Sequence, residues 1–205
     1  DYYPALAQPN VAVLKDGIRE VREHSIVTGS GEERPVDVII YATGFDVEHA
    51  YGPIELRGRD GRSFAQALDE GAGAYKGATV HGFPNLFFIV GPNTGLGHSS
   101  MVFMIESQVA YAVDAVRRMR ASGVRAVEPT REAQRTWNDD VQRRMQRTVW
   151  NRGGCSSWYL DDHGRNVTLW PRTTYTFRRL TSRFDTEAYV ATRTTDSRHD
   201  RKVSV

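Results

Sequence analysis

The two most apolar stretches of the chain, residues 36–41 and 86–90, have the length of a β-strand and almost no alternation of polar positions. A strand without such alternation is buried on both faces, as the strands of parallel sheets are. Each stretch leads into a turn of small residues and glycine. The pattern therefore predicts an α/β protein in which these two segments are core strands.

The remaining elements follow from hydrophobic periodicity and from turn residues. Helical patterns lie at 63–70, at 100–122, where Gly123 closes the helix, and at 130–149. We expect the shorter strands and strand-like pieces at 11–14, 18–21, 25–28, 124–127, 158–160, 168–170 and 175–177. The polar residues 192–205 are typical of a frayed tail.

Length and composition exclude several classes of protein. With 205 residues, 40% of them hydrophobic, the chain holds no run of the ~18 apolar residues that a membrane span needs. One cysteine excludes an internal disulfide framework and a cysteine-rich zinc module. No charged segment followed by an apolar one marks a signal peptide, so we expect a cytoplasmic protein. Because the chain does not begin with methionine, we expect translation to start upstream of Asp1.

The charge pattern does not indicate nucleic acid as a partner. The formal net charge is +2, and arginine accounts for 24 of the 27 basic residues, a bias typical of a GC-rich bacterial genome. Residues 117–152 hold many of these arginines; a solvated helix face is favoured there over contact with a cofactor phosphate or with nucleic acid. No two histidines have helical metal-ligand spacing, so we expect no metal site.

The strongest local feature is a strand, a glycine-rich loop and a helix at 86–110. Gly91, Gly95 and Gly97 allow a close approach of backbone, and the following helix directs its free N–H groups at whatever lies beyond the loop. Ser100 stands where a dinucleotide fingerprint has its third glycine, so this is not the usual pyrophosphate loop. Two interpretations stay open: a ligand-binding loop, or a tight turn whose glycines serve packing. His98 is the one histidine inside the motif and a candidate acid or base.

Two further segments have the composition of ligand-binding turns. The apolar stretch 36–41 ends in small residues at Thr43 and Gly44, at the strand end where ligands bind in open α/β sheets, although an ordinary core strand has the same pattern. Residues 153–159 combine two glycines with Trp158, as loops that close over a site do, but Trp158 packed in the core is the alternative. Cys155 has no evident basic partner and is expected to be inert.

Three of these segments together resemble one family. Residues 37–46 resemble the D-x-x-x-x-A-T-G-F/Y motif of flavin-containing and Baeyer–Villiger monooxygenases, and residues 91–106 and 154–160 resemble segments of bacterial Baeyer–Villiger monooxygenases. The segments follow the family's order, and the resemblance covers nearly all of residues 1–190. It implies an α/β fold: the C-terminal portion of a Rossmann-like flavoprotein with two dinucleotide-binding domains, incomplete on its own.

The resemblance also implies a division of the chain. Residues 1–35 correspond to the end of the NADPH domain and a returning linker, and 36–125 to the C-terminal part of the FAD-binding domain. Residues 126–191 correspond to a C-terminal helix and a cofactor-covering loop region, followed by the tail at 192–205.

Several family features are absent from the sequence. It contains neither a strand-coupled G-x-G-x-x-G for FAD or NADPH, nor the F-x-G-x-x-x-H-x-x-x-W fingerprint, nor the upstream active-site arginine of Baeyer–Villiger enzymes. We therefore expect the chain alone to be inactive and to need the missing N-terminal half of the same enzyme as its partner.

For the site, the resemblance implies that the start of the long helix meets the flavin, with the Met101 N–H facing the pyrimidine carbonyl. The FAD contacts that it implies are Gly91, Asn93, Gly95, Ser100 and Met101. It places Leu96, Gly97 and His98 on the substrate side, Thr43 and Gly44 in the cofactor neighbourhood, and Trp158 on the mobile loop that folds over NADP.

The function implied for the parent enzyme is FAD- and NADPH-dependent insertion of one oxygen atom from O2 into a ketone through a flavin peroxide. Oxidation of nitrogen or sulfur in an organic substrate is the alternative. A flavin disulfide reductase is disfavoured because its chemistry needs a cysteine pair. The alternative from another class is a non-catalytic binding module or an inactive remnant.

Overall fold

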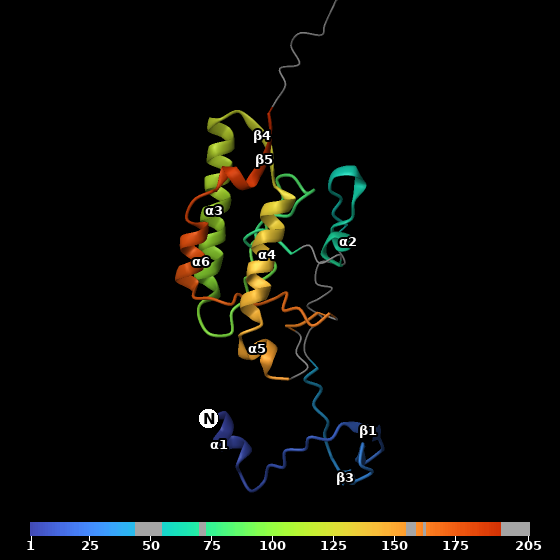
Figure 1. Cartoon of the computed structure of the whole chain (residues 1–205). Coiled ribbons are helices and arrows are strands. Elements are labelled where there is room, and N and C mark those ends of the chain that lie inside the picture. The colour runs from blue at the N-terminus through green and yellow to red at the C-terminus, as the bar shows by residue number, and fades with distance from the viewer. Residues whose placement is uncertain (44–54, 70–72, 155–158, 162, 194–205) are drawn as a thin grey trace, which may run out of the picture. The chain divides into compact units, whose positions relative to one another are not determined.

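The computed structural model of the chain describes residues 1–43, 55–69, 73–154, 159–161 and 163–193 (Figure 1). By its internal contacts the chain divides into two compact units, Asp1–Phe45 and Asp46–Val205.

The first unit is built on a small antiparallel sheet with the strand order β1-β2-β3. The elements of this unit are α1 (Tyr2–Leu6), β1 (Ile18–Val21), β2 (Ser25–Thr28) and β3 (Glu33–Pro35). Val21 pairs with Ile26, and Ile26 pairs with Arg34, so β2 is the central strand and the most buried one. The predicted strands at 18–21 and 25–28 are confirmed.

The predicted core strand at 36–41 is wrong for this chain. The segment forms no strand, and Val38, Ile40 and Tyr41 are 76%, 85% and 80% exposed. A parallel strand takes its hydrogen bonds from neighbouring strands. The Val36 N–H donates to the His24 carbonyl at 3.0 Å, but the described residues place no strand in a ladder with 37–41. The predicted strand at 11–14 is also absent, and Val13 is exposed.

The second unit is organised around one long helix, α3 (Met101–Ala121) (Figure 1). The other elements of this unit are η1 (Arg59–Gly61), α2 (Phe64–Asp69), β4 (Val124–Pro129), α4 (Arg131–Met145), α5 (Val149–Arg152), α6 (Thr174–Thr181), η2 (Thr186–Ala188) and β5 (Tyr189–Arg193). Helix α6 packs along α3, and β4 pairs with β5 in a two-stranded antiparallel sheet.

The predicted helices are confirmed, with shifted ends. Gly123, with φ of +65°, follows the end of α3, because a left-handed residue cannot continue the helix. Thr130 caps α4, where its hydroxyl accepts a hydrogen bond from the Ala133 N–H at 3.1 Å. The helix predicted at 130–149 ends at Met145, and α5 follows as a separate short helix.

Other strand predictions need correction. Residues 86–90 form no strand, and Val90 leaves the extended conformation with φ of +60°. Residues 175–177, predicted as a strand-like piece, lie inside the helix α6. Of 168–170, Leu169 makes a single parallel bridge to Gly95. Leu160 makes a single antiparallel bridge, to Asn166, and Trp158 lies outside the described residues.

The last described residues belong to the sheet of the second unit. Two residues of the expected tail, Thr192 and Arg193, belong to β5 and pair with β4. The remainder, 194–205, lies outside the described residues.

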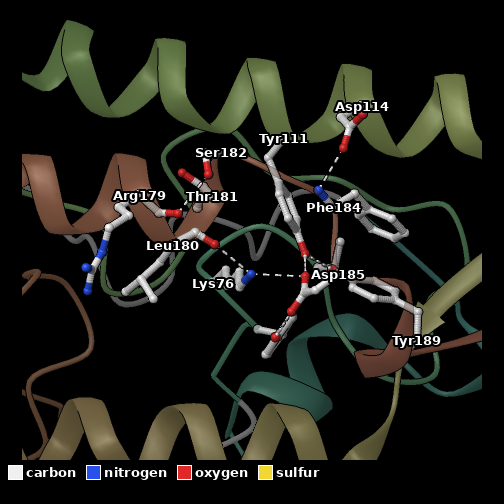
Figure 2. A network of polar contacts seen from close by, with 12 residues as sticks. Lys76, Tyr111, Asp114, Arg179, Leu180, Thr181, Ser182, Phe184, Asp185 and Tyr189 are labelled. Carbon is white, nitrogen blue, oxygen red and sulfur yellow. Dashed lines mark hydrogen bonds and ion pairs between the residues drawn. The ribbon is translucent and has the colours of Figure 1, made fainter.

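A network of hydrogen bonds and one ion pair connects the segment 180–189 to the rest of this unit. Figure 2 shows Asp185 between Tyr111 of α3 and Lys76 of the 75–79 turn. The Asp185 carboxylate accepts hydrogen bonds from Tyr75 and, at 2.6 Å, from Tyr111, and pairs with the Lys76 ammonium at 3.0 Å. Lys76 also donates to the Leu180 carbonyl at 2.7 Å. This network, with a further bond of 3.0 Å between the hydroxyls of Tyr111 and Tyr189, joins three separate parts of the chain.

We predict that Asp185→Asn lowers the free energy of unfolding by about 3 kcal/mol, because it leaves the buried Lys76 ammonium without its counter-charge while one acceptor oxygen remains. The control Asp140→Asn removes the more exposed pairs with Arg143 and Arg144 and is expected to cost less than about 1 kcal/mol. Urea unfolding of both variants measures the difference. Equal losses would show that the burial of Lys76 gives its pair with Asp185 no greater weight.

We also predict a loss of stability at alkaline pH. Burial, with a contribution from the Asp185 charge, raises the pKa of Tyr75, Tyr111 and Tyr189 well above the usual tyrosine range. The unfolded chain then releases these protons first, so stability falls as the pH rises above about 10. Lys76 acts in the opposite sense, because burial lowers its pKa. Its contribution to the free energy of unfolding therefore rises with pH until the pH passes the ordinary pKa of lysine.

Because three tyrosines oppose one lysine, we expect the free energy of unfolding to fall above about pH 10. Unfolding free energies measured across pH 8 to 12, together with tyrosinate absorbance, check this prediction. The Tyr111→Phe variant serves as the control and is expected to show a shallower decline. A slope equal to that of the unmodified chain would contradict the assignment.

Candidate functional site

The glycine-rich segment 91–100 lies directly before α3, and the chain's own backbone holds it. The Asn93 N–H donates to the Val167 carbonyl at 2.9 Å. Gly95 exchanges two backbone hydrogen bonds of 2.8 Å with the same region, donating to Thr168 and accepting from Trp170. The loop is therefore fixed along the segment 166–170 before it enters the helix.

The side chain of Asn93 strengthens this attachment. It is buried, and its amide nitrogen donates to the carbonyls of Asn166 at 2.7 Å and of Leu169 at 3.1 Å. Asn93 itself has φ of +57°, a conformation that asparagine tolerates better than most residues. Asn93 thus shapes the loop from within, and any contact of this residue with a cofactor stays a prediction.

The glycines of the loop are required for packing within the chain. A Cβ atom on Gly91 would lie 2.3 Å from the Gly77 carbonyl oxygen, and one on Gly95 would lie 2.9 Å from the Thr168 carbonyl oxygen. A Cβ on Gly97 would lie 2.7 Å from the indole of Trp150. Of the two interpretations left open by the sequence, close packing accounts for all three glycines.

The first turn of α3 is where the site remains open to a ligand. Ser100 is the exposed N-cap residue, its side chain makes no capping hydrogen bond within the described residues, and the first turn has no acidic residue. The N–H groups at Met101 and beyond therefore keep their hydrogen-bonding capacity at the positive end of a 21-residue helix. An electron-rich oxygen is the ligand that this arrangement suits.

The predicted substrate-side residues lie beside this opening in sequence and differ in burial. Gly97 and His98 are exposed, whereas Leu96 is half-buried and packs, as Met101 does, against the cluster that contains Met104. In the described part of the chain His98 forms no ion pair with a carboxylate, and its role as an acid or base stays a prediction.

The remaining predicted site residues are Thr43, Gly44 and Trp158. Thr43 is exposed and belongs to the first unit. Gly44 and Trp158 lie outside the described residues, as does Cys155. Tyr159, which follows Trp158, has its ring 5.3 Å from the ring of Trp150 in an edge-to-face contact.

The sequence analysis missed Gln108. This side chain is fully buried and binds two loops, since it accepts from the Val90 N–H and donates to the Gly77 carbonyl, each at 2.8 Å. A signal was present: Met104, Gln108 and Tyr111 recur at helical spacing, which puts a glutamine on the apolar stripe of the helix.

Two classes of site find no support among the described residues. They contain no group of three side chains that suits a metal ion. None of their helices combines the length and apolar character that a membrane crossing needs.

Comparisons with known proteins confirm the resemblance drawn from the three segments. No family model matches the chain. The chain is 50% identical, over 95% of its length, to a Baeyer–Villiger monooxygenase of Pseudomonas aeruginosa, and 50% identical, over 92%, to one of Streptomyces coelicolor. It spans 37% and 36% of the lengths of these two relatives.

Solved structures agree with the sequence relatives. A closed crystal structure of cyclohexanone monooxygenase matches with a TM-score of 0.74 and 29% identity, over 94% of this chain and 38% of that one. An oxidised steroid monooxygenase bound to NADP matches with a TM-score of 0.74 and 26% identity, over 94% of this chain and 38% of that one. With half of its residues identical to those of its relatives over nearly its whole length, and with the same fold, the chain belongs to the Baeyer–Villiger monooxygenase family.

Proposed function

We propose that this chain is one part of an FAD- and NADPH-dependent monooxygenase that inserts one oxygen atom from O2 into a ketone. The observation that carries the proposal is the 50% identity, over 95% of the chain, to a relative named as a Baeyer–Villiger monooxygenase. The chain spans about 37% of that relative, so the proposal assigns the two dinucleotide-binding loops to further polypeptide.

The exposed apolar segment 36–41 supports this division. Val38, Ile40 and Tyr41 have the composition of a core strand but face solvent in the described structure. Strands from the remainder of the enzyme would supply the missing backbone partners and cover these side chains. On this proposal residues 1–35 complete the NADPH domain, 36–125 complete the FAD-binding domain, and 126–191 provide the covering region with Trp158.

The residues at the start of α3 fit a flavin. When bound, FAD supplies the redox centre that accepts hydride from NADPH and activates O2. The Met101 N–H is assigned to a carbonyl oxygen of the flavin ring, because the uncapped helix start favours negative charge there. The exposed Gly97 and His98 are assigned to the side from which the substrate enters.

The role of the Met101 N–H can be tested without dismantling the helix. Met101 is the first residue of α3, a position where proline is accepted, and Ser100 already has the extended conformation that precedes proline. We predict that Met101→Pro lowers kcat in the FAD-bound enzyme by about 100-fold, the usual cost of one lost donor to a developing anion. Steady-state kinetics with saturating NADPH measure the change.

The matched control is Met101→Ala, which removes the half-buried side chain but keeps the N–H. It is expected to cost far less than Met101→Pro. If the two variants lose activity equally, packing rather than the N–H is responsible, and the assignment is wrong.

The proposed reaction is tested in the complete flavoprotein that includes this chain. NADPH oxidation with a cyclic ketone under isotopically labelled O2 is expected to give a lactone that carries one labelled oxygen. Label found only in a nitrogen or sulfur oxide, with suitable amines and sulfides supplied, would favour heteroatom oxidation. Absence of substrate-dependent NADPH oxidation would contradict the proposal as a whole.

A further inference from the structure

One amide side chain connects α3 to the two loops that meet behind the glycine-rich segment. Gln108 is fully buried in α3, on the same side as Met104 and Tyr111. Its Oε1 accepts from the Val90 N–H and its Nε2 donates to the Gly77 carbonyl, each at 2.8 Å. Because one partner is a donor and the other an acceptor, only one orientation of the amide satisfies both.

The residue held by Oε1 is in an unfavourable conformation. Val90 has φ of +60°, in the left-handed region that a β-branched residue rarely adopts. Its side chain is 41% exposed, so burial compensates only part of this cost. Such conformations persist where the surroundings enforce them, and the Gln108 carbonyl is the side-chain group that binds the Val90 N–H.

The residue held by Nε2 is fixed independently. Gly77 has φ of +60°, and a Cβ there would lie 2.1 Å from Thr94, so the turn and the loop are in close contact. The neighbouring Lys76 is anchored to Asp185 and to the Leu180 carbonyl (Figure 2). The position of the Gly77 carbonyl is therefore fixed by contacts other than Gln108, and Gln108 connects Val90 to it.

We propose that Gln108 is a positioning residue for the glycine-rich loop. By holding Val90 in the left-handed conformation beside the Gly77 turn, it sets the direction in which residues 91–97 run toward the first turn of α3. The consequence for flavin affinity rests on the proposed function, whereas the control of loop conformation does not.

The loop is tested first in the chain itself, by hydrogen exchange of Gln108→Met. This substitution keeps the length of the side chain and removes both hydrogen bonds. Exchange in peptides covering 88–96 is expected to accelerate by about tenfold or more, while β4 stays unchanged. The matched control is Gln134→Met, which removes another buried glutamine whose Oε1 accepts from the His81 N–H at 2.6 Å. Unchanged exchange at 88–96, or the same acceleration in both variants, would overturn the proposal.

A second measurement uses a substitution outside the core. Val90→Gly relieves the left-handed strain and is expected to raise the melting temperature of the unmodified chain by about 2–4 °C. In the Gln108→Met background the gain is expected to be smaller, because the loop has already relaxed. In the Gln134→Met background it is expected to be unchanged. Equal gains in all three backgrounds would show that Gln108 does not enforce the conformation of Val90.

The consequence for flavin affinity is tested by measuring the FAD dissociation constant of the complete flavoprotein. Gln108→Met is expected to weaken binding by about tenfold, and Gln134→Met by less than about twofold. Accelerated exchange with unchanged FAD affinity would overturn the consequence for flavin binding, because Gln108 would then hold the loop without affecting the cofactor. Failure of the unmodified enzyme to bind FAD would instead overturn the proposed function, since the exchange experiment judges the loop without FAD.

Discussion

A β-strand takes its hydrogen bonds from other segments, and this requirement governs what the chain forms from its own residues. The segment 36–41 has the side chains of a core strand but belongs to no sheet in the described structure, and Val38, Ile40 and Tyr41 stay exposed. In the second unit, the segment 86–90 is held instead by single contacts, including the Phe88 N–H to the Ala78 carbonyl and the Val90 N–H to Gln108. These contacts determine the direction in which the glycine-rich loop leaves residue 90.

The difference between local and non-local hydrogen bonding also explains which elements could be predicted from the sequence. The helices α3 and α4 satisfy their own backbone, so periodicity, the Thr130 cap and Gly123 were sufficient to locate them. The hairpin strands β1 and β2 have partners nearby in sequence and were located equally well. The two apolar runs have the pattern of buried parallel strands. That pattern shows that a segment is suited to a buried sheet, but it does not show whether neighbouring strands are present.

The cofactor and substrate contacts of the candidate site stay predictions, and the structure adds what holds the loop in place. Position and residue types located the loop at 91–100 and the start of α3, and the comparisons support the family inferred from them. The sequence left open whether the glycines serve a ligand or packing, and Gly91, Gly95 and Gly97 make room for the chain's own carbonyls and for Trp150. Gln108 could not be predicted as a functional residue, because a single glutamine among apolar positions belongs to no recognisable motif. Its role follows only from its two partners, which are distant in sequence.

The central claim is that this chain completes a larger α/β flavoprotein, with 36–41 as a strand that lacks its neighbours in the described structure. Hydrogen exchange of the amides of residues 37–41, compared between the chain alone and the complete flavoprotein, tests it most directly. The account predicts rapid exchange in the chain alone and strong protection, by orders of magnitude, in the complete protein. Equal exchange in the two would contradict it, because a segment that gains no partners is not a strand of the larger sheet.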